Sequence, residues 1–143
     1  MNAGWNTLQK HALKSTCIIA NIMTRQEVLQ WEVDNRNSKN RAEDNNGCSY
    51  YIPYKTGCAV GRLMDRKKAK RIEEIASKES LGLHAVFDLF PEDVKSLGLD
   101  FLQEMQWMHD ESTYFTTKGL SPSGIEMAKK IAKKYNLNIK GLT

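Results

Sequence analysis

Apolar residues recur every three to four positions in three stretches of the chain, which is the spacing of one helical face. The spacing predicts helices over about 66–77, over about 99–110 and from residue 122 onward. In the second of these, Trp107 projects away from the apolar arc, so we expect its indole to lie at a contact surface or under the loop that follows. The three apolar faces consist of Ala69, Ile72, Ile75 and Ala76; Phe101, Leu102, Met105, Met108 and His109; and Ile125, Ala128, Ile131, Ala132 and Tyr135.

Residues that favour helix starts stand before these and one further stretch. Asp65 is a candidate N-cap for the first helix, and Ser121 followed by Pro122 suits the start of the last. The run 24–27, Thr-Arg-Gln-Glu, is a capping box, with Met23 and Val28 at the positions of a hydrophobic staple. A helix is therefore expected to begin at residue 24.

The segment before Met23 carries a looser helical pattern over about 7–20. Because the capping box opens a well-formed unit of its own, we predict an N-terminal helical extension over 1–22 and a single domain over 23–143. Packing or self-association is the expected role of the extension, and an ordinary first helix is the simpler alternative.

Two short β-like segments, 48–52 and 57–61, flank four residues that suit a turn. They predict an antiparallel hairpin in which paired residue numbers sum to about 109, so that Cys48 opposes Gly61 and Cys58 opposes Tyr51. This register favours small buried thiols over a disulfide. Together with the helices, it predicts an α+β fold: a predominantly helical single domain with a small antiparallel β-hairpin.

The remaining segments are short or polar. Residues 35–47 offer almost no apolar area, so we expect an exposed and mobile polar loop, which could act as a lid. The run 83–87 fits a short strand or a helical turn, and Pro91 is expected to open a short helix that Gly98 ends.

Composition limits the classes of protein that fit. The chain has 143 residues, 41% of them hydrophobic and 27% charged, with a net charge of +4, which is typical of one folded domain and below the charge of a dedicated nucleic-acid binder. Three cysteines leave one unpaired under any disulfide scheme, which favours a reducing cytoplasm. The apolar run 17–20 is too short for a signal peptide or membrane span, so no membrane partner is expected.

The basic run after Asp65 is the main functional signal. Its cations come first and its glutamates later, an order that opposes the helix dipole unless an anion lies nearby. A solvated charged face is the plain alternative. We predict an anionic ligand held by side chains of the hairpin and the basic helix: Tyr50, Tyr54, Arg62, Arg66, Lys67, Lys70 and Arg71.

Catalytic and metal motifs are incomplete. Cys58, His109 and Asp110 supply the residue types of a hydrolase, but neighbours on a helix point about 100° apart, so a structural histidine is the alternative and these three form only a secondary site. The nine residues between Cys48 and Cys58 do not fit a zinc knuckle, and 57–62 lacks the Gly-Lys-Ser/Thr ending of a P-loop. No metal or cofactor is expected.

Three short motifs resemble those of a family of small uncharacterised phage and prophage proteins. They are the Cys-Ser-Tyr run at 48–50, the Gly-Cys-Ala-Val-Gly run at 57–61 and the Gln-x-x-His-Asp pattern that ends at Asp110. With the start at Met23, the similarity spans most of 23–137. The resemblance implies a phage origin and a shared fold rather than a reaction.

A phage origin, if shared, implies a small accessory protein in the host cytoplasm. The resemblance thus favours a non-enzymatic homo-oligomer that binds an anionic, nucleotide-like small molecule, as in sequestration of a nucleotide-derived immune signal in anti-defence, with Trp107 at the subunit interface. The alternatives are an interaction protein that binds a host protein or nucleic acid through the basic face, and a small Cys/His hydrolase.

Overall fold

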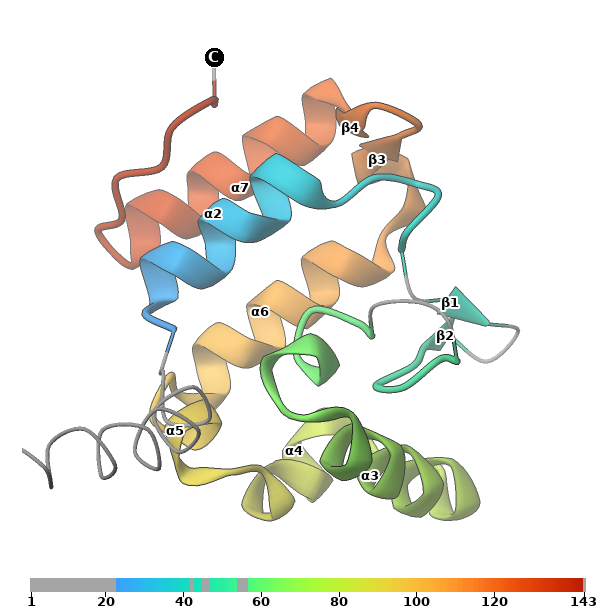
Figure 1. Ribbon diagram of the computed structural model, residues 1–143. Coiled ribbons are helices and arrows are strands. Elements are labelled where there is room, and N and C mark those ends of the chain that lie inside the picture. The colour runs from blue at the N-terminus through green and yellow to red at the C-terminus, as the bar shows by residue number, and fades with distance from the viewer. Residues whose placement is uncertain (1–22, 42, 45–46, 54–56, 143) are drawn as a thin grey trace, which may run out of the picture.

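The computed structural model describes residues 23–41, 43–44, 47–53 and 57–142. Helices predominate in this part of the chain, and two short antiparallel hairpins accompany them, so the predicted α+β class is confirmed (Figure 1). The α-helices are α2 (Arg25–Asn35), α3 (Arg66–Glu79), α4 (Leu83–Val86), α5 (Glu92–Lys95), α6 (Leu99–Asp110) and α7 (Pro122–Lys134). The 3-10 turns are η2 (Gly61–Leu63), η3 (Phe87–Leu89) and η4 (Ser112–Tyr114), and the strands are β1 (Glu43–Asp44), β2 (Gly47–Cys48), β3 (Phe115–Thr116) and β4 (Gly119–Leu120).

Helix starts follow the capping signals of the sequence. The Thr24 side chain accepts from the Glu27 amide while the Glu27 side chain accepts from the Thr24 amide, which completes the predicted capping box. Asp65 caps α3 by accepting from the Lys68 amide at 2.9 Å. Ser121 caps α7 in the same way. The N-terminal ends of three helices were therefore predictable from local chemistry.

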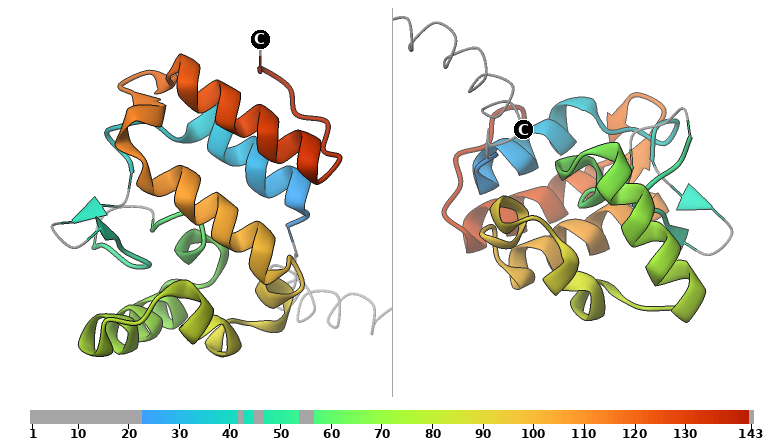
Figure 2. Two further views of the ribbon diagram at one scale, coloured as in Figure 1. Left: turned by 180° about the vertical axis from the view of Figure 1, so that it is seen from behind. Right: turned by 60° about the horizontal axis from the view of Figure 1, so that its bottom comes forward.

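Helix α6 lies at the centre of the arrangement. In Figure 1 and in the left view of Figure 2, α2 and α7 run side by side in opposite directions, and α6 lies between them and α3. Its predicted apolar arc is buried, whereas Trp107 is 63% exposed, so the outward position of this indole is confirmed. The buried residues of α6 are Phe101, Leu102, Met105, Gln106, Met108 and His109.

The predicted hairpin between 48–52 and 57–61 is wrong. Strand β2 pairs instead with β1, where Glu43 faces Cys48, and the Cys58 amide donates to the Ser49 carbonyl at 3.0 Å rather than facing Tyr51. The reason is close backbone packing: a Cβ on Gly61 would lie 2.2 Å from the Tyr50 carbonyl oxygen. The chain thus curls over that carbonyl into a turn and then η2, instead of extending as a strand.

The remaining predictions concern the short segments between the long helices and the N-terminal extension. The run 83–87 is helical, as α4 and the start of η3, and Gly98 ends the region of α5 with a φ of 93°. The second hairpin, β3–β4, pairs Phe115 with Leu120 in a stretch for which no strand was predicted. The extension over 1–22 and the side chain of Tyr54 lie outside the described residues.

Candidate functional site

A buried charge cluster lies beneath the predicted basic site. Glu32, at 0% exposure, accepts from Arg36 Nε at 2.9 Å through one carboxylate oxygen and from Arg62 Nε at 2.7 Å through the other. Arg62 also donates to the Val28 carbonyl, and its guanidinium lies 3.9 Å from the centre of the Trp31 ring. Arg62 was predicted to bind an anionic ligand, but the structure places it in the core with an internal carboxylate as its partner.

The electrostatics of Glu32 explain why its buried carboxylate stays ionised at neutral pH. Burial alone would raise the pKa of Glu32, yet the two guanidiniums outweigh burial and hold that pKa below its ordinary value. Arg36 is satisfied further by the backbone carbonyls of Asn40 and Gly57. The cluster therefore ties α2 to the loop after it and to the segment before η2.

The polar loop predicted at 35–47 begins with two buried arginines. Arg36 is 1% exposed and Arg41 is 7% exposed. Arg41 donates to the backbone carbonyls of His109 at 2.6 Å and of Asp110 at 2.9 Å, which end α6. The described part of this loop is thus anchored by guanidinium contacts that composition alone did not indicate.

The secondary site of Cys58, His109 and Asp110 is largely closed to solvent. Cys58 is 0% exposed, and its sulfur accepts from the Gly61 amide at 3.4 Å. His109 is 1% exposed, and its Nδ1 lies 3.6 Å from Asp110 Oδ1. Burial lowers the pKa of His109 below its ordinary value, and the nearby Asp110 carboxylate offsets this only in part. A substrate could reach only the carboxylate of Asp110 without rearrangement of the core.

The outer face of α3 is where predicted site residues do gather. We call Arg66, Lys67, Lys70 and Arg71 the α3 cations; all four are exposed. The Arg66 guanidinium lies 4.6 Å from the centre of the Tyr51 ring and donates to the Ile52 carbonyl, and Lys70 Nζ lies 5.8 Å from the same ring. Among the residues that the structure describes, Lys67, Lys70 and Arg71 form no ion pair.

Tyr50 does not join this face. It is 8% exposed, its ring packs against Phe90 with centroids 6.2 Å apart, and its amide donates to Glu73 Oε1 at 2.6 Å. Tyr51 occupies the position beside the α3 cations instead. The predicted site is therefore divided: four cations remain together on an open surface, whereas Arg62 and Tyr50 belong to the interior.

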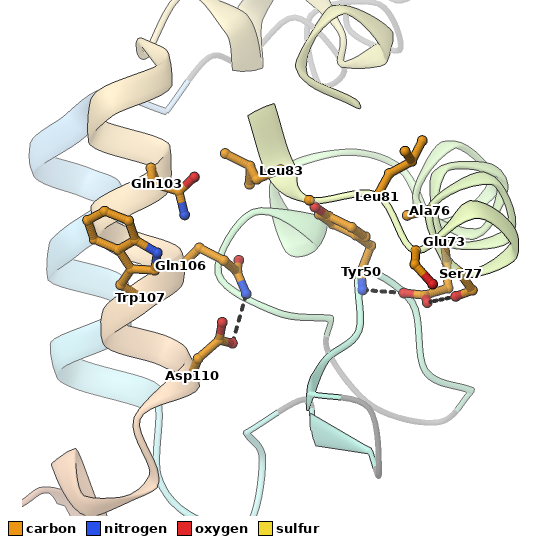
Figure 3. A pocket seen from close by; sticks show the side chains of 12 residues that line it. Tyr50, Glu73, Ala76, Ser77, Leu81, Leu83, Gln103, Gln106, Trp107 and Asp110 are labelled. Atoms are coloured by element: carbon orange, nitrogen blue, oxygen red, sulfur yellow. Dashed lines mark hydrogen bonds between the residues drawn. The ribbon is translucent and has the colours of Figure 1, made fainter. Parts of the chain in front are cut away.

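A cleft that the sequence did not predict lies between α3–α4 and α6 (Figure 3). Its volume is about 650 Å³. Helix α6 contributes Gln103, Gln106, Trp107 and Asp110, and the facing wall includes Tyr50, Glu73, Ser77, Leu81 and Leu83. The exposed Trp107 was the one sequence signal that pointed here, because no spacing rule brings residues near 73 and 106 together.

Comparisons with known proteins add no relative: no protein-family model, curated protein or solved structure matches the chain. The resemblance to small phage proteins accordingly stays a prediction. Within the described ranges, no three His, Cys, Asp or Glu side chains gather as a metal site. No helix in the same ranges is long and apolar enough to cross a membrane.

Proposed function

We propose that this protein is a binding protein that contacts an extended polyanion, such as a nucleic-acid strand, through the α3 cations. The observation that carries the proposal is the exposed row formed by Lys67, Lys70 and Arg71, which among the described residues have no carboxylate partner. Lys67 and Arg71 stand one helical turn apart, about 6 Å along the axis, so both can reach one strand of phosphates.

The position of these charges on the helix supports an external anion. Cations in the first turns of a helix face the positive end of its dipole, which is mildly unfavourable. Asp65 places one carboxylate at this end, where it caps the Lys68 amide. A phosphate backbone alongside α3 would supply the further negative charge that the row lacks.

The shape of the surface favours an extended partner over an enclosed nucleotide. The cleft between α3–α4 and α6 is not lined by Arg66, Lys67, Lys70 or Arg71. All four α3 cations are exposed, so a single small anion bound to them would stay mostly hydrated, whereas a strand could make several contacts at once. Arg66 is held in place by Tyr51 and Ile52, which gives the face one oriented guanidinium.

Fluorescence anisotropy with a labelled single-stranded oligonucleotide, measured over a series of salt concentrations, tests this proposal. About three phosphate contacts would give a slope of log affinity against log salt of about −2, because each contact to a single strand releases about 0.7 of a counterion. The variant Lys67→Glu/Lys70→Glu/Arg71→Glu should abolish this binding.

The matched control lies on α7, which also carries a lysine-rich outer face. Lys129→Glu/Lys130→Glu/Lys133→Glu changes the net charge by the same amount and should leave most of the binding intact. Equal losses in the two variants would show attraction to overall charge rather than to α3. Tight, salt-insensitive binding of a mononucleotide would favour an enclosed ligand and contradict the extended partner.

A further inference from the structure

The cleft between α6 and α3–α4 differs in charge from the surface formed by the α3 cations. Among the residues that the structure describes, its lining includes the carboxylates of Glu73 and Asp110 and no lysine, arginine or histidine. Such a lining repels phosphates and attracts cations. The cleft therefore suits a ligand of opposite charge to the partner proposed for the α3 cations, and the two sites share no side chain.

Gln106 gives the cleft a specific acceptor. The residue is only 6% exposed, and its Nε2 donates to Asp110 Oδ1 at 3.1 Å. Because an ionised carboxylate only accepts, this contact fixes the amide so that Oε1 is the other atom. Among the described residues, that buried Oε1 has no hydrogen-bond partner. Figure 3 shows the Gln106 side chain extending from α6 toward the facing wall of the cleft.

The other acidic group of the cleft is already engaged. Glu73 Oε1 accepts from the Tyr50 amide, and Glu73 Oε2 accepts from Ser77 Oγ at 2.5 Å (Figure 3). Asp110 has a side chain that is 43% exposed. The acceptors left for a ligand are thus the Asp110 carboxylate and Gln106 Oε1. Because Oε1 is buried, it reaches a ligand only when the Gln106 amide turns about the soft last torsion of its side chain and exchanges its contact with Asp110 for one with the ligand.

We infer that this cleft binds a guanidinium group. A guanidinium is planar and carries several N–H donors in a fixed fork, so one group can donate to Asp110 and to Gln106 Oε1 together. It also stacks on aromatic rings, and the exposed Trp107 indole stands at the same cleft. Leu81 and Leu83 on the facing wall offer apolar surface for the aliphatic stem that carries the group.

Isothermal titration calorimetry on the full chain tests the inference. The probes are agmatine, the peptide acetyl-Gly-Arg-Gly-amide, and its citrulline counterpart, in which the guanidinium is replaced by a neutral urea. The arginine peptide should bind about tenfold more tightly than the citrulline peptide, as expected for charge-assisted hydrogen bonds. Tighter binding of agmatine would indicate a free small guanidine, and tighter binding of the peptide would indicate an arginine side chain of a polypeptide.

Three variants locate the binding. Gln106→Leu and Asp110→Asn should each weaken the arginine probe about fivefold or more, and Trp107→Ala, at an exposed position, should weaken it while the fold stays intact by circular dichroism. The side-chain amide resonance of Gln106 in a nitrogen-15 NMR spectrum should shift on titration. The variant Lys67→Glu/Lys70→Glu/Arg71→Glu should bind the probe at least as tightly as the native chain, whatever becomes of polyanion binding.

The inference fails if arginine and citrulline peptides bind equally, or if neither binds. It also fails if Asp110→Asn and Trp107→Ala both fold and leave the affinity unchanged. Loss of polyanion binding with intact guanidinium binding would separate the two proposals, because none of the α3 cations lines the cleft.

Discussion

Two groups of cationic side chains have different surroundings in this protein. The guanidinium groups of Arg36 and Arg62 are buried, and they contact Glu32, Trp31 and backbone carbonyls. The α3 cations, which follow Arg62 within ten residues, are exposed, and Lys67, Lys70 and Arg71 have no ion-pair partner among the described residues. The difference teaches that neighbouring basic residues in one sequence segment can serve stability and binding separately.

Removing the carboxylate at the centre of the buried cluster should have the largest effect on stability. Glu32→Ala leaves two guanidiniums in the interior without their shared counter-charge, and breaking a buried ion pair in this way costs about 3–5 kcal/mol. Urea denaturation at neutral pH would measure the loss.

The control for Glu32 is an exposed glutamate on α3. Glu74→Ala should change the free energy of unfolding by no more than about 0.5 kcal/mol. A similar loss in both variants would contradict the division between buried and surface charges.

Replacing Arg62 by lysine sharpens the comparison, because lysine keeps the charge and loses the planar fork. Arg62→Lys should lower the free energy of unfolding by about 2 kcal/mol, since the contact with Val28 and the stacking over Trp31 both need a guanidinium. Arg71→Lys on α3 is the matched control and should leave stability unchanged. Unchanged stability in Arg62→Lys would mean that the charge alone holds Glu32.

Local chemistry predicted much of the fold. The helix starts at Thr24, Asp65 and Ser121 depend on side chains within three residues, and the extent of α6 follows from its apolar arc, so both were readable from the sequence. The hairpin failed because the segment 57–61 packs on the Tyr50 carbonyl, a backbone contact that no side-chain pattern shows.

The candidate sites were less predictable, because they depend on contacts between distant segments. Arg62 belongs to a basic segment that is typical of a binding site. It has a structural role only because its guanidinium donates to Glu32, thirty positions earlier in the sequence. The cleft at Gln106 forms because α3 and α6, which are distant in the sequence, both contribute residues to its walls. Only Trp107, as an indole outside its apolar arc, signalled that α6 has a second surface.

Acid should destabilise the protein in two separate pH windows. Burial lowers the pKa of His109 below 6.5 in the folded state, despite the nearby Asp110 carboxylate. The unfolded chain therefore binds a proton first, and the free energy of unfolding should fall as the pH drops below about 6.5, by up to about 1.4 kcal/mol per pH unit. Arg36 also disfavours the protonated ring, whereas Glu32 favours it.

Urea denaturation of the native chain and of His109→Gln between pH 7.5 and 5.5 would measure the first window. The variant should lose this slope even if it is less stable throughout. The pKa of Glu32 is also lowered, so its contribution is present above 4.5 and is lost only as the pH falls through its lower folded value. The same slope between pH 7.5 and 5.5 in both proteins would exclude His109 as its source.

Charge reversal on the outer face of α3 should have the smallest effect on stability and the largest on binding. Lys67 stands in the first turn, where a glutamate suits the helix dipole better than a lysine, so Lys67→Glu should leave the free energy of unfolding within about 0.5 kcal/mol of the native value, on the stabilising side. Thermal denaturation followed by circular dichroism would measure this. If Lys67→Glu instead lowered stability, Lys67 would have a structural partner, and the α3 cations would resemble Arg62 after all. A Lys67→Glu variant that folds as well as the native chain and no longer binds an oligonucleotide would show that Lys67 serves binding. The lysine would then slightly lower helix stability in exchange for contact with a partner.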